Sequence, residues 1–153
     1  MFTWLRSLFS SSCVVEITPQ RVSVRDLGNG QQHEFSPVLS LDASNRVASI
    51  GHPVSSAAVE TFEPFASPSA LVKNGRMAEL LMQYAYSRVG SNQWIKAAPS
   101  VVLFVPRDRE NALASVEDSV LLDLSERAGA CRTVVHRGSR PTDEAANVML
   151  NEA

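Results

Sequence analysis

The segment from Ser100 to Pro106 constrains the fold more than any other part of the chain. Its central residues, Val-Val-Leu-Phe-Val, are all apolar, and such a run is typical of a strand buried on both faces of a sheet. A helical pattern follows and ends at Gly129, and a strand pattern returns from Thr133 to His136. This order predicts a right-handed strand–helix–strand crossover with Ser100 to Pro106 as the central strand, in an α/β fold whose mixed sheet is flanked by helices.

Three helices are predicted in the second half of the chain. Asn74 can cap the first of them, and Thr142 can cap a closing helix that starts near Pro141. The helix between these two has apolar side chains at helical spacing, which predict the face that packs on the sheet. These side chains are Leu113, Val116, Val120, Leu124 and Ala128.

The first half of the chain is predicted to be rich in strands. Alternating side chains favour strands from Cys13 to Ile17 and from Arg21 to Val24, and Gln32 to Leu41 is predicted to follow as one further strand. The Gly28-x-Gly30 pair favours a hairpin turn over a phosphate loop, because no helix pattern follows it. Beyond this antiparallel meander, Arg46 to Ile50 is predicted as a strand and Ser55 to Glu60 as a short helix.

The first ten residues form an amphipathic pattern. On a helical wheel the large apolar side chains occupy one arc, and Arg6 lies on the opposite side, where it can face anionic lipid. This pattern predicts that residues 1–12 form a helix lying on a membrane surface, with a core-packing helix, a short signal peptide and a frayed terminus as the alternatives. The predicted membrane-binding residues are Met1, Phe2, Trp4, Leu5, Leu8 and Phe9.

Composition excludes several other classes of function. The 153 residues carry a formal net charge of −2, with acidic and basic residues interspersed, so no basic face is available for nucleic acid. Cys13 and Cys131 lie far apart in the sequence, as do the three histidines, so no metal motif is present and no metal is expected. Two such cysteines are typical of reduced thiols in a cytoplasmic protein.

Several segments occur in the order found in the bacterial actin homologue MreB. The amphipathic start resembles the membrane-binding start of that family, and Val14 to Val24 resembles its first hairpin. The segments Phe35 to Leu41 and Val47 to Gly51 resemble its next strands, and Val101 to Pro106 resembles the strand leading towards its ATP site. The resemblance implies that residues 13–150 form a single actin-like, ribonuclease H-like half-domain, which corresponds to the first half of the actin fold.

The nucleotide-binding residues of that family are altered here. In the family the first strand ends in Asp-Leu-Gly-Thr, where the Asp serves the metal and the Gly lets the backbone approach phosphate. This sequence places Glu16, Thr18 and Pro19 at the Asp, Gly and Thr positions, so the resemblance implies a vestigial phosphate turn. For the carboxylate that positions the attacking water, Glu110 and Glu117 are the candidates, with a solvated surface role as the alternative.

These observations predict a noncatalytic protein without a cofactor. Such a protein would act as a membrane-associated partner in the cell-shape cytoskeleton, peripheral on the inner face of the cytoplasmic membrane. Its predicted partners are the membrane surface and a protein, either MreB-type filaments or further copies of itself. Phosphoryl transfer requires metal, phosphates and water to be placed together, so a chain that lacks most of the groups that place them is not expected to hydrolyse ATP on its own. The alternative is residual ATP binding, completed by a partner chain or by self-association.

Overall fold

The computed structural model describes residues 11–51, 55–65, 74–89, 98–106 and 114–153, so the predicted membrane helix lies outside the described residues. The strands are β1 (Ser12–Ile17), β2 (Val22–Asp26), β3 (Gln32–Phe35), β4 (Leu39–Leu41), β5 (Val47–Ile50), β6 (Glu60–Phe62), β7 (Ser100–Pro106) and β8 (Arg132–Gly138). The helices are α2 (Gly75–Ser87), α3 (Ala114–Arg127) and α4 (Asp143–Glu152).

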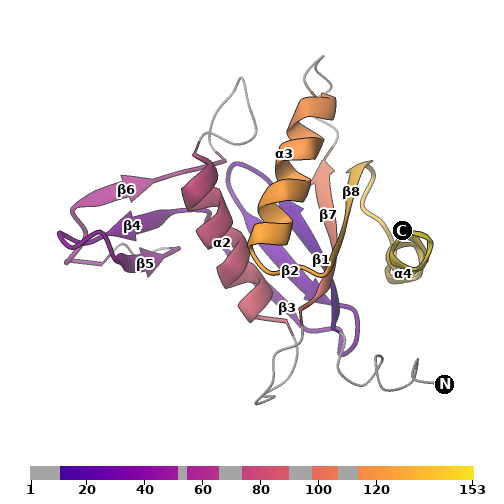
Figure 1. Ribbon diagram of the computed structural model, residues 1–153. Helices are drawn as coiled ribbons and strands as arrows, with labels where there is room; N and C mark the ends of the chain where they lie inside the picture. Colours follow the sequence, from indigo (N-terminus) through magenta and orange to yellow (C-terminus); the bar gives the residue numbers. More distant parts are fainter. Residues whose placement is uncertain (1–10, 52–54, 66–73, 90–97, 107–113) are drawn as a thin grey trace.

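The main sheet is mixed and has five strands in the order β3-β2-β1-β7-β8. β1 pairs antiparallel with β2 and parallel with β7, and β7 pairs parallel with β8. In Figure 1, α2 and α3 lie side by side over this sheet, and α4 lies apart from them. The predicted mixed sheet flanked by helices is therefore confirmed.

β7 is buried from Val101 to Val105, as its unbroken apolar run predicts. It is followed by α3 and then by the parallel strand β8, so the predicted strand–helix–strand order is confirmed. The prediction that β7 is the central strand is wrong, because β1 occupies the middle of the sheet. An unbroken apolar run indicates that a strand is buried on both faces of the sheet. It does not indicate where the strand stands in the strand order.

The face of α3 that packs on the sheet is rotated from the predicted one. Leu124 is buried as predicted, but Val120 is 40% exposed and the neighbouring Leu121 is fully buried. Adjacent apolar residues on a helix lie about 100° apart, so either could have faced the core. Packing against α2 and the sheet selects Leu121.

The β1–β2–β3 meander is confirmed, including the hairpin turn at Gly28 and Gly30. The N–H of Gly30 donates to the Asp26 carbonyl at 2.9 Å, and the N–H of Gly28 donates to the Asp26 side chain at 2.7 Å. The predicted single strand from Gln32 to Leu41 is wrong, because β3 and β4 belong to different sheets. Pro37 lies between them and has no N–H for a continuous ladder.

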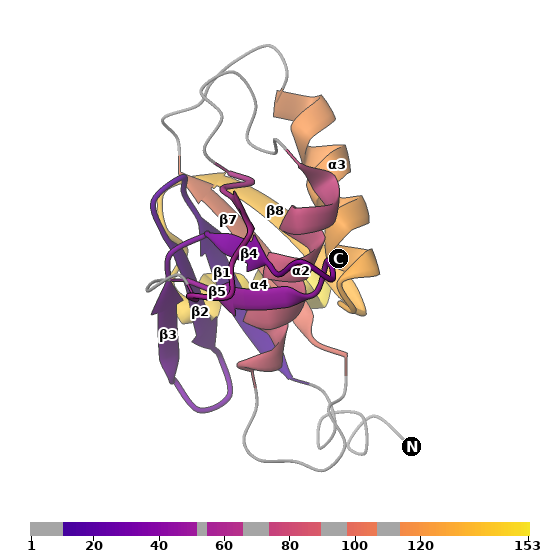
Figure 2. The ribbon, with the colours of Figure 1, turned by 90° about the vertical axis from the view of Figure 1, so that its left-hand side faces the viewer.

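A second, smaller sheet has the strand order β5-β4-β6, and Figure 2 views the molecule from its side. The helix predicted from Ser55 to Glu60 is wrong. Ser55 starts a turn, in which the Ala58 N–H donates to the Ser55 carbonyl at 3.0 Å, and Val59 then donates to the Leu41 carbonyl at 2.8 Å. The strand β6 (Glu60–Phe62) begins at the end of this segment and pairs with β4, a contact that no local pattern could predict.

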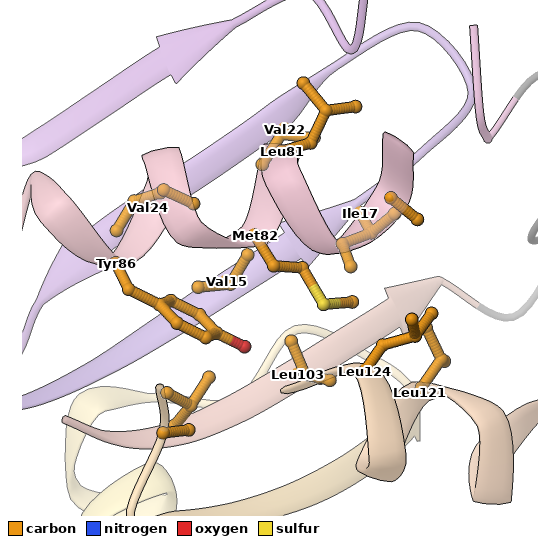
Figure 3. Close-up of a cluster of buried hydrophobic side chains, with 14 of the residues drawn as sticks. Val15, Ile17, Val22, Val24, Leu81, Met82, Tyr86, Leu103, Leu121 and Leu124 are labelled. Carbon is orange, nitrogen blue, oxygen red and sulfur yellow. The ribbon is translucent and has the colours of Figure 1, made fainter. Parts of the chain in front are cut away.

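The larger core lies between the main sheet, α2 and α3. Figure 3 shows Val15, Ile17, Val22, Val24 and Leu103 from the sheet meeting the helical side chains Leu81, Met82, Tyr86, Leu121 and Leu124. The small sheet adds Leu39 and Leu41 to the same cluster. One continuous core therefore joins both sheets.

Three hydroxyl groups cross this core. The Tyr86 and Ser125 hydroxyls are 2.6 Å apart, and the Ser125 and Thr133 hydroxyls are also 2.6 Å apart. This chain of hydrogen bonds links α2, α3 and β8, and it satisfies the fully buried Ser125 hydroxyl.

Candidate functional site

The candidate site lies at the carboxyl end of β1, where the resemblance places the phosphate turn. Successive side chains of a strand point to opposite faces, so Val15 and Ile17 face α2 and α3, whereas Val14 and Glu16 face the α4 side. On that side Glu16 lies beside Ser23 of β2 and Phe104 of β7. In α/β sheets, ligands bind outside the carboxyl ends of strands, so this is the expected position for a site.

The Glu16 carboxylate is held by two arginines. Arg21 Nη2 lies 3.3 Å from Oε1, and Arg140 Nη2 lies 2.5 Å from Oε2. The Glu16 side chain is 11% exposed, whereas the side chains of Arg21 and Arg140 are 41% and 58% exposed. A buried carboxylate therefore has a charged donor on each oxygen, supplied from solvent-facing side chains.

The turn after Glu16 is closed by its own hydrogen bonds. The Thr18 N–H donates to the Arg21 carbonyl at 2.9 Å, and the Thr18 hydroxyl donates to the same carbonyl at 3.0 Å. The Arg21 N–H donates to the Thr18 hydroxyl at 3.0 Å. Pro19 has no N–H, so the turn directs few backbone donors outward.

A shallow depression of about 30 Å³ lies beside Glu16. This volume holds about one or two water molecules and is far below that of a typical ligand pocket. Its lining combines charged and polar side chains with the apolar side chains of Val14, Phe104 and Pro141. The residues are Val14, Glu16, Ser23, Arg25, Gln32, Phe104, Arg140, Pro141 and Asp143.

The three predicted residues of the phosphate turn, Glu16, Thr18 and Pro19, lie together at the end of β1. The predicted membrane-binding side chains and Glu110 lie outside the described residues, as does the side chain of Glu117. Sequence reasoning missed Arg140, which lies 124 residues after Glu16 and in a connector with no motif. No local pattern could have linked these two residues.

Within the described part of the chain, no group of three or more His, Cys, Asp or Glu side chains could hold a metal ion. The same residues contain no helix long and apolar enough to cross a membrane.

Solved structures of similar fold are bacterial actin-like proteins. MreB5 of Spiroplasma citri bound to AMPPNP superposes with a TM-score of 0.64 at 12% identity, covering 84% of this chain and 38% of that one. The ADP-bound form of MreB5 gives a TM-score of 0.63 at 12% identity over the same shares of both chains. A non-polymerising mutant of MamK bound to AMPPNP gives 0.61 at 13% identity, covering 84% of this chain and 41% of that one.

The sequence matches no protein-family model and no curated protein. The chain spans about 38% of the length of the first solved neighbour, so the likeness concerns one part of a larger fold. The described residues therefore adopt part of the actin-like fold, with a two-arginine ion-pair cluster at the carboxyl end of β1.

Proposed function

We propose that this protein is a noncatalytic, actin-like partner of the bacterial cell-shape cytoskeleton. It binds MreB-type filaments or further copies of itself, and its N-terminal helix holds it at the inner face of the cytoplasmic membrane. The observation that carries the noncatalytic part is the Glu16 carboxylate, because both of its oxygens are paired with arginine.

The chemistry of the turn supports this proposal. A carboxylate that serves Mg²⁺ must offer oxygen atoms to the cation or to its bound water, and Glu16 offers both of its oxygens to guanidinium groups. A phosphate-binding turn must point N–H groups at the ligand, and the N–H groups of Thr18 and Arg21 are used inside the turn. These contacts occupy the groups that would meet metal and phosphate, and this supports the noncatalytic proposal.

Calorimetric titration with Mg²⁺ and AMPPNP tests the noncatalytic part. We expect no binding heat, while a nucleotide-binding bacterial actin measured in parallel gives a clear one. The titration is repeated with filaments of that actin present. A heat from the mixture that exceeds the heat of the same filaments alone would support residual nucleotide binding completed by a partner. A heat from the chain alone would overturn the proposal.

Co-sedimentation tests the filament part. We expect the protein to pellet with preformed MreB filaments and to stay in the supernatant without them. Pelleting that saturates with filament concentration separates binding from trapping. A protein that stays in the supernatant at every filament concentration, and that sediments as a monomer alone, would exclude both filament binding and self-association.

Vesicle sedimentation tests the membrane part. One short helix with a single arginine binds lipid weakly, so we expect partial pelleting with anionic vesicles and less with neutral ones. Leu5→Asp places a charge on the apolar arc and is expected to abolish pelleting. Thr3→Asp places the same charge on the polar arc and is the matched control. Equal pelleting of the two variants would contradict an amphipathic mode of binding.

A further inference from the structure

Helix α4 buries fewer of its own side chains than α2 does. It buries only Ala146 and Leu150 fully, whereas α2 buries five side chains. Val148 of α4 is 52% exposed. A helix of ten residues is marginal by itself in water, so α4 depends on its contacts with the sheet.

Those contacts combine a small apolar cluster with polar ties. Ala146 and Leu150 pack against Val14, Val102 and Phe104. Arg25 Nε of β2 lies 3.2 Å from Asp143 Oδ1, and Arg132 of β8 donates to the Leu150 carbonyl at 2.6 Å. Arg140, in the connector that leads into α4, adds the ion pair with Glu16.

Separating α4 from the sheet has unequal consequences for these contacts. The Arg25 and Asp143 side chains are each 45% exposed, so water can replace their ion pair at little cost. The apolar cluster is different, because Val14, Val102 and Phe104 would be left uncovered. An opened chain therefore gains most from covering the same three side chains again.

We propose that two copies of this chain exchange α4, so that each main sheet is covered by the helix of the other copy. Helix α4 of a second copy has the same sequence, so it can make the same contacts with the face of the main sheet that α4 covers. It brings Asp143 to Arg25, and it brings Ala146 and Leu150 to the apolar cluster. The inference rests on the self-association part of the proposed function and names the element that would mediate it.

The connector between β8 and α4 suits such an exchange. Ser139, Arg140 and Thr142 are exposed and Pro141 is half-buried outside the core clusters, so the connector can change path without uncovering a core side chain. Gly138 precedes it with φ at +113°, a conformation that sharply redirects the chain and that glycine leaves with little penalty. Hinge segments of exchanged dimers require this freedom.

Two charge reversals test the exchange. Arg25→Asp places an aspartate opposite Asp143 in the same chain, and Asp143→Arg places an arginine opposite Arg25. When the two variants are mixed, only exchanged heterodimers restore an opposite-charge pair at both sheets. We expect native mass spectrometry to show about fivefold more heterodimer in the mixture than homodimer in either variant alone, the size expected for two half-exposed pairs.

The double variant R25D/D143R is the matched control, since it restores the pair within one chain. We expect it to dimerise like the native chain. A mixture with no excess of heterodimer would overturn the proposal. If a variant fails to fold, unlabelled and ¹⁵N-labelled native chains are mixed instead. Salt weakens exposed ion pairs, so heterodimers that form faster at high salt support the exchange. The absence of heterodimers at every protein concentration overturns it.

These outcomes are independent of the filament test. Filament binding by a strictly monomeric chain would overturn the exchange alone. Heterodimers without filament binding would overturn only the filament part of the proposed function.

Discussion

The two faces of the main sheet are built from the same strands and differ in what they bury. Under α2 and α3 the sheet presents an apolar surface continuous with the small sheet. Under α4 it presents a small apolar cluster, bordered by the ion pairs of Arg25 and Glu16. Residues on one strand thus serve two purposes, because alternate side chains face opposite ways.

The face under α2 and α3 therefore contributes most of the stability, and the face under α4 carries the candidate site. A large apolar face removes most surface from water and dominates the free energy of folding. The charged face contributes less, because its arginines remain half in solvent. Four measurements test this division.

Removing one leucine from each face gives the largest expected effect. Leu81→Ala on α2 should lower the free energy of unfolding by about 3–5 kcal/mol, because this fully enclosed site cannot collapse around the cavity. Leu150→Ala on α4 should cost about 2–3 kcal/mol, since a lightly attached helix can shift to fill the space. Urea denaturation measures both, and equal losses would contradict the division.

Removing the central hydroxyl of the buried chain comes next. Ser125→Ala leaves the Tyr86 and Thr133 hydroxyls without their shared partner, so we expect a loss of about 1–3 kcal/mol. Ser44→Ala, at an exposed turn, is the control and should change stability by less than about 0.5 kcal/mol. A loss for Ser125→Ala no larger than the control's would show that the hydroxyl chain contributes nothing to α2–α3–β8 packing.

Alkaline pH should lower the free energy of unfolding through two groups buried under α2 and α3. Burial, with a smaller contribution from the charge of Asp26, raises the pKa of the Cys13 thiol, and burial raises the pKa of the Tyr86 hydroxyl. The unfolded chain ionises first, near the ordinary values of about 8.5 for Cys and 10 for Tyr, so it holds fewer protons than the folded chain. Stability should therefore be constant up to about pH 8 and then fall.

For each group the fall should approach about 1.4 kcal/mol per pH unit above its ordinary pKa. Urea midpoints measured between pH 7 and pH 10.5 test this. In Cys13→Ala the fall between about pH 8.5 and 10 should flatten, whatever the variant's stability at pH 7. An unchanged slope in that variant would show that Cys13 is not the titrating group.

Neutralising Glu16 should give the smallest effect. Glu16→Gln removes the charge that Arg21 and Arg140 share, but both arginines can be rehydrated in place, so we expect a loss of about 1 kcal/mol or less. Glu34→Gln, whose side chain is 48% exposed and pairs with Arg21 at 3.6 Å, is the control and should cost less. A Glu16→Gln loss as large as that of Leu81→Ala would show that the ion-pair cluster, rather than the apolar face, dominates stability.

Features that depend on a few neighbouring residues were predictable from the sequence. Asn74 accepts from the Met77 N–H at 3.2 Å, and Thr142 accepts from the Ala145 N–H at 3.1 Å, so both predicted caps are confirmed. The break at Pro37 was also local, but it was overlooked. Helical spacing alone could not predict whether Val120 or Leu121 is buried, because this depends on which elements pack against α3.

Residue patterns were enough to predict the hairpin turn at Gly28 and Gly30, the two helix caps and the buried character of β7, because these depend on contacts within a few residues or on the composition of one segment. Only the tertiary structure placed β1 between β2 and β7 and drew residues 60–62 into a sheet with β4. It also brought Arg140 to Glu16 across 124 residues. Contacts of this kind arise when the whole chain closes around its core, and no local periodicity encodes them.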